Sequence, residues 1–109
     1  MVRRSQGQLT MLKITVHEDQ RMHTIKLDGR IGGPWVEELE RTWAALAASL
    51  GSKKLLLDLR DVTFADGNGR KLLREIYQET HAAFLTDSPL TKYFADEAMQ
   101  RRKRELEGE

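Results

Sequence analysis

The sequence predicts one α/β domain with a mixed sheet, built from an N-terminal antiparallel hairpin followed by right-handed βαβαβ crossovers. Three observations support this class. Two stretches of alternating apolar and polar residues lie close together near the N-terminus, a nearly continuous apolar run lies mid-chain, and stretches with helical periodicity separate the later strands. At 109 residues the chain has room for a single core.

The first two strands are expected at 12–16 and 22–31. Leu12, Ile14 and Val16 alternate with polar residues, which predicts a strand with one buried face. Alternation resumes after the polar turn 17–21, so the two strands are expected to pair as a hairpin.

The first helix is expected over residues 34–50. Pro34 suits the first helical position because its φ is already helical and the N–H that it lacks is not needed there. Gly51 is expected to end the helix. Apolar residues at spacings of three and four predict one buried stripe: Val36, Leu39, Trp43, Leu46 and Leu50.

The second half of the chain repeats the strand–helix order. The apolar run over 53–59 has almost no alternation, which predicts a central strand, and a loop is expected over 60–68. The next helix should end near His81, with an apolar face of Leu72, Leu73, Ile76 and Tyr77. A short strand at 82–86 leads to a helix that starts at Ser88-Pro89, with a buried stripe of Leu90, Tyr93, Phe94 and Ala98.

Composition narrows the classes of function. The chain has no cysteine, so disulfides and thiolate metal sites are excluded, and a reducing, cytoplasmic location is expected. A formal charge of +1 favours neither nucleic acid nor an anionic membrane as a partner. We expect a flexible tail at 1–10 rather than a signal peptide or membrane span, a domain over 11–99, and a charged helix end or tail at 100–109.

The segment 54–69, KLLLDLRDVTFADGNG, carries the most specific pattern. Its apolar strand leads through Val62-Thr63-Phe64 to Asp66-Gly67-Asn68-Gly69. It resembles the signature segment of STAS domains, the modules of anti-sigma-factor antagonists and sulfate-transporter tails, in which Asp-Ser-Ser-Gly stands at the end. The resemblance extends over about 12–98. It implies a STAS-like fold and a protein-binding regulatory role, with no catalytic activity, no cofactor and no metal.

The sequence departs from the family at the two serines. In the antagonists the second serine accepts a phosphoryl group from an anti-sigma kinase, and here Asn68 stands at that position without a hydroxyl. Thr63 is the only nearby hydroxyl and is therefore the secondary candidate acceptor. We expect Asn68 to cap the following helix. We also expect the domain to stay in the unphosphorylated, binding-competent form.

The resemblance also implies a partner-facing surface around this segment. Its residues are Arg30, Gly33, Asp66, Gly67, Asn68, Gly69, Arg70 and Lys71. The expected partner is an anti-sigma factor or kinase, and the alternative is an accessory STAS subunit of an anion or lipid transporter complex. Members of the family continue into a final strand and helix, which the residues after Met99 do not offer. We therefore expect a shortened C-terminus, with an open sheet edge that favours a homodimer or edge docking.

Two other phosphate-related functions remain alternatives. Gly67 to Gly69 could cradle a phosphate at a helix start, although no third glycine follows at Leu72 and no P-loop exists. The strand around Asp58 also resembles the phospho-accepting strand of receiver domains, with Glu18-Asp19 as their acidic metal-binding pair. Receivers, however, place a helix where 22–31 predicts a strand.

The remaining candidate groups favour structural roles. Asp58, Asp61 and Asp66 could be proposed as a metal or catalytic cluster, but the three histidines are scattered, so we expect these aspartates to end a strand and cap a helix. The basic run 101–104 is followed at once by glutamates, which favours a solvated helix end. Trp43 is expected in the core, and Trp35 either in the core or as a binding anchor.

Overall fold

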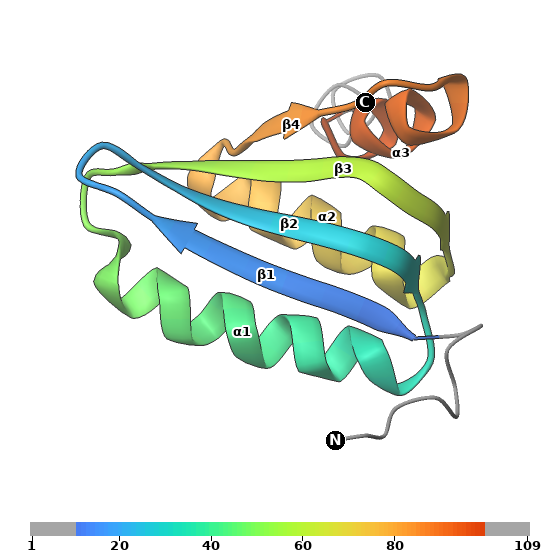
Figure 1. Ribbon diagram of the computed structural model, residues 1–109, viewed down its shortest axis with the longest axis horizontal. Coiled ribbons are helices and arrows are strands. Elements are labelled where there is room, and N and C mark those ends of the chain that lie inside the picture. Colours follow the sequence, from blue (N-terminus) through green and yellow to red (C-terminus); the bar gives the residue numbers. More distant parts are fainter. Residues whose placement is uncertain (1–10, 100–109) are drawn as a thin grey trace, which may run out of the picture.

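The computed structural model describes residues 11–99, and the predicted tails 1–10 and 100–109, with the basic run 101–104, lie outside the described residues. Seven elements follow one another along the chain (Figure 1). They are β1 (Leu12–Glu18), β2 (Met22–Ile31), α1 (Pro34–Leu50), β3 (Lys54–Ala65), α2 (Gly67–Thr80), β4 (Ala83–Leu85) and α3 (Pro89–Met99). The predicted order and type of every element are confirmed.

The four strands form one mixed sheet in the order β1-β2-β3-β4. β1 and β2 pair antiparallel as a hairpin, whereas β2 with β3 and β3 with β4 pair parallel. Each parallel pair is joined by a helix, α1 for the first and α2 for the second. The fold class predicted from the sequence is therefore confirmed.

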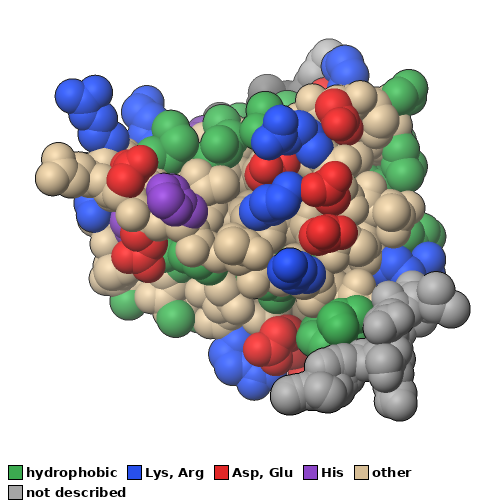
Figure 2. Space-filling model, viewed as in Figure 1, with side chains coloured by type: hydrophobic (Ala, Val, Ile, Leu, Met, Phe, Trp, Pro, Cys, Tyr) green, Lys and Arg blue, Asp and Glu red, His purple; other side chains and the backbone are tan. Residues whose placement is uncertain are grey.

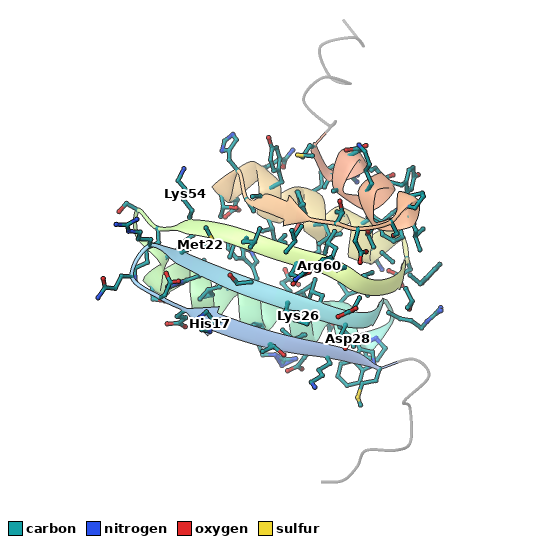
Figure 3. The ribbon with its side chains drawn as sticks, turned by 45° about the horizontal axis from the view of Figure 1, so that its top comes forward. His17, Met22, Lys26, Asp28, Lys54 and Arg60 are labelled. Atoms are coloured by element: carbon teal, nitrogen blue, oxygen red, sulfur yellow. The ribbon has the colours of Figure 1, made fainter. Side chains whose placement is uncertain are left out.

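The core lies between one face of the sheet and the helices. Ile25 and Leu27 of β2 and Leu57 of β3 are fully buried on this face. In Figure 1, α2 passes behind the sheet and α1 runs along the β1 side, while α3 packs against α2 and β3. The opposite face carries polar side chains, among them Lys26 and Arg60 (Figure 3). Within residues 11–99, no helix is both long and apolar enough to cross a bilayer.

Local signals set both ends of α1 where the sequence predicts them. Gly33 precedes the helix with a φ of 57°, and Pro34 opens it. Gly51 follows the last residue with a φ of 58°, a conformation that glycine adopts without strain. Trp43 lies in the core as expected, and Trp35 is half-buried against it.

The prediction of a loop over 60–68 is wrong, because β3 continues to Ala65. The register with β2 shifts twice, between Lys26 and Asp28 and between Gly29 and Arg30, and each shift adds one residue to β3. Such bulges break the period-2 pattern of a strand. Buried residues then recur at spacings of three, at Leu59, Val62 and Ala65, which is why alternation does not reveal this half of the strand.

Two predicted buried faces also differ from the structure. Val16 of β1 is 38% exposed although its partner Ile25 is fully buried, because β1 is an edge strand with no neighbour on its other side. In α3, Leu90 and Tyr93 are 45% and 55% exposed, and Thr91 and Ala95 take the inner positions instead. Backbone N–H groups of residues 87 and 88 both donate to the Thr91 hydroxyl, at 3.2 Å each, which fixes this rotation of the helix.

Candidate functional site

Asp66 organises the turn from β3 into α2. One carboxylate oxygen accepts a hydrogen bond from the Gly69 N–H at 2.8 Å, which caps the helix, and the other accepts one from the Gly33 N–H at 3.1 Å. The side chain therefore joins the start of α2 to the start of α1. The donated N–H groups, that of Gly69 above all, hold the pKa of Asp66 below its usual value because they stabilise the charged form.

Gly69 lets α2 begin directly against β2. The residue is buried, and a Cβ at this position would overlap the carbonyl oxygen of Ile31 and stand 2.8 Å from the Ile31 Cγ2 atom. Gly67, two residues earlier, has open space in the same direction. Asp66 and Gly69 are therefore required by the fold, whereas Gly67 and Asn68 between them are exposed.

Asn68 is exposed in the first turn of α2. Its predicted capping role is wrong, because the helix begins at Gly67 and Asp66 supplies the cap. Thr63, the other candidate acceptor, is exposed on β3. Both candidate positions, Asn68 and Thr63, are thus accessible from solvent.

The structure does not bring all the predicted site residues together. Arg30 lies over the ring of Phe64 on β3, 4.3 Å from its centroid, and both side chains point away from the buried Ile31. The Arg70 side chain donates to the carbonyl of Ala65 at 2.9 Å and forms an ion pair with Glu97 of α3 at 3.0 Å. Arg30 and Arg70 are therefore occupied within the fold.

A groove of about 550 Å³ runs between the N-terminal halves of α1 and α2. Gly33, Asn68 and Lys71, three of the predicted site residues, line it. The other members of this lining are not among the predicted site residues: Pro34, Val36, Glu37, Glu40, Leu72 and Glu75. Their spacing in the sequence predicts only that they lie on the faces of two helices. The groove could not be predicted from it, because the groove forms where the two helices pack together.

The open face of the sheet carries a network of charged side chains, seen as the mixed basic and acidic group in the middle of Figure 2. Asp58 is 4% exposed and accepts from Arg60 Nε and Nη2 at 3.1 and 3.0 Å. Lys26 donates to Asp61 at 2.6 Å. The pKa of Asp58 is lowered, and the largest cause is the hydrogen bonding from the Arg60 side chain. The expectation that Asp58 and Asp61 end a strand is wrong, since both lie within β3.

Neither the metal site nor the receiver arrangement is formed by the described part of the chain. No group of three His, Cys, Asp or Glu side chains among residues 11–99 is placed to hold a metal ion. Asp19 lies in the β1–β2 turn, where it accepts from the N–H groups of Arg21 and Met22 at 2.9 and 2.8 Å. The chain continues from there into a strand, where a receiver has a helix.

The fold and the β3–α2 turn together define a class. A mixed four-stranded sheet with an N-terminal hairpin and two parallel crossovers is a STAS-like α/β fold, as the resemblance of residues 54–69 implied. The crystal structure of an anti-sigma factor antagonist from Mycobacterium paratuberculosis has this fold, with a TM-score of 0.63. The two chains are 22% identical, and the match covers 90% of this chain and 79% of the other. The sequence matches no family model and no curated protein.

Proposed function

We propose that this chain is a STAS-like regulatory module of the anti-sigma-factor-antagonist type, which acts by docking a protein partner and carries out no chemistry of its own. One observation carries the proposal. Asp66 and Gly69 are committed to the turn, whereas Asn68 is exposed in the first turn of α2 and lines the groove beside α1. The fold of the M. paratuberculosis antagonist supports the same class of function.

Docking at this site would act by occlusion. A partner that covers the start of α2 cannot use the covered surface for another protein, so competition requires only complementary surfaces. Phosphorylation of a serine at position 68 would place about −1.5 to −2 charges beside the groove. Asn68 has no hydroxyl, so docking here is not controlled by phosphorylation at this position.

The test combines binding with phosphoryl transfer. The tagged full chain and an Asn68→Ser variant are each mixed with a purified anti-sigma factor kinase and ATP, and intact mass and complex formation are measured. We expect the native chain to stay unmodified and bound, and the variant to gain one phosphate and dissociate. A phosphate found within residues 63–69 of the native chain, on Thr63 above all, would contradict the proposal that the chain always stays unphosphorylated and able to bind.

The partner itself is identified by affinity capture followed by reconstitution from purified proteins. A stoichiometric complex with an anti-sigma factor, lost in an Asn68→Trp variant that blocks the start of α2, is the expected result. A matched Ser52→Trp variant, at an exposed residue between α1 and β3, should leave the complex intact. A complex with a transporter ATPase instead would assign the accessory-subunit function.

A further inference from the structure

The groove between α1 and α2 is lined by acidic side chains together with some apolar surface. Pro34 and Val36 of α1 supply apolar surface, and Lys71 is the single basic side chain in the lining. The lining also holds the carboxylates of Glu37, Glu40 and Glu75. With one ammonium group against three carboxylates, the groove carries a net charge of −2. The groove is therefore negative although the whole chain carries a formal charge of +1.

None of these three glutamates forms a close ion pair within the described part of the chain. No Lys or Arg among residues 11–99 lies within ion-pairing distance of them. By contrast, Glu38, which does not line the groove, pairs with Arg41 at 3.3 Å. Carboxylates gathered along a concave surface concentrate negative potential there. A basic group that enters the groove gains from this potential.

The groove is also held in shape before any partner arrives. The Asp66 carboxylate accepts from Gly33 N–H and Gly69 N–H, so one side chain fixes the starts of both helices that form the walls. Burial of Leu72 in the core fixes α2 further along. A preformed site loses little conformational entropy on binding, which favours affinity for a complementary segment.

We propose that this groove receives a basic, amphipathic segment of the partner, with an Arg or Lys side chain directed at the glutamates and neighbouring apolar side chains on Pro34 and Val36. This inference rests on the proposed function, because Asn68 lies at the same groove and is thereby part of the docking surface. It adds the chemistry of the partner, which the proposed function leaves open. Electrostatic attraction of this kind acts mainly on the association rate and weakens with salt.

The first test uses a helical peptide with one arginine between two leucines placed one turn on either side. The ¹⁵N-labelled full chain is titrated with this peptide and with a twin in which glutamate replaces the arginine. The arginine peptide should shift the backbone amide signals of Val36, Asn68 and Leu72, and the glutamate twin should leave them in place. Equal shifts with both peptides, or no shift at these amides with the arginine peptide, overturn the proposal.

Two charge reversals on α1 supply the matched comparison. Glu40→Lys changes the groove, whereas Glu38→Lys makes the same change of charge on the same helix outside it. We expect Glu40→Lys to weaken the arginine peptide by about tenfold or more and Glu38→Lys to change its affinity by less than about threefold. Far-UV circular dichroism confirms that both variants are folded. Equal effects of the two reversals contradict a groove-specific site.

The same variants separate this inference from the proposed function. If the reconstituted partner complex is lost in Asn68→Trp but unchanged in Glu40→Lys, the module docks at the start of α2 and the groove chemistry is wrong. If Asn68→Trp leaves the complex intact, the proposed docking surface itself fails. Loss of the complex in both variants, with an affinity that falls steeply as salt is raised, is the expected result.

Discussion

At the scale of a single residue, alanine substitutions at two glycines of the β3–α2 turn are expected to change the stability of the fold in opposite ways. Gly69→Ala forces a methyl group into the carbonyl of Ile31, so we expect the free energy of unfolding to fall by about 1–3 kcal/mol. Gly67→Ala meets open space at an exposed helical position and should be neutral or stabilise the fold by up to about 1 kcal/mol. Urea unfolding followed by circular dichroism measures both. Equal losses in the two variants would contradict the close approach of α2 to β2.

A second residue-scale prediction concerns acid stability. Arg60 lowers the pKa of Asp58 in the folded state, so the stabilisation is complete above the unfolded-state value of 3.8 and is lost as the pH falls through the lower folded-state value. Asp58→Asn removes this charge from a buried position, and we expect a loss of about 1–3 kcal/mol at neutral pH. The variant should also lose less stability on acidification than the native chain. Unfolding free energies measured from pH 7 down to acid check both statements.

At the scale of an element, alanine substitutions in α3 distinguish the observed rotation of this helix about its axis from the rotation that the sequence predicts. Phe94 is 4% exposed and Tyr93 is 55% exposed, although the sequence places both on the buried stripe. Phe94→Ala should destabilise the fold by about 3–5 kcal/mol. Tyr93→Ala should cost less than about 1 kcal/mol. Thermal unfolding compares them, and a larger loss for Tyr93→Ala would support the predicted rotation instead.

Elements could be predicted where the deciding signal is local. Pro34 and Gly51 set the ends of α1 through their own backbone preferences, so both ends are correct. The second half of β3 could not be predicted, because its bulges depend on how it pairs with β2. The rotation of α3 depends in the same way on Thr91, a polar residue whose burial is allowed by hydrogen bonds from the preceding turn.

The candidate site, too, has a part that local sequence signals predict and a part that depends on tertiary packing. The 66–69 turn is recognisable from its own residues, and the structure gives Asp66 and Gly69 definite roles. The groove could not be predicted, because Glu40 and Glu75 come together only when α1 and α2 pack side by side. Arg70 shows the converse, since it is predicted to face a partner and its ion pair with Glu97 of α3 is a tertiary contact.

At the scale of the whole molecule, the order of the strands predicts a gradient of local stability. β2 and β3 have a neighbour on each side, whereas β1 and β4 are the edges of the described sheet. Amides that are paired at the centre of a sheet open only with large unfolding events. Hydrogen exchange should therefore be slowest for Ile25 and Leu57 and markedly faster in β4. Uniform exchange across the four strands would contradict this arrangement.

In the β3–α2 turn, the residues that hold the backbone are different from the exposed residue Asn68, and this separation has an evolutionary consequence. Because Asp66 and Gly69 hold the turn and the Asn68 side chain is exposed, we expect a substitution at position 68 to cost little in folding. Codons for asparagine and serine differ by a single base. Under the proposed function, one mutation would place a phosphorylatable serine at the docking surface, so a kinase could gain control of the module while its architecture is inherited unchanged.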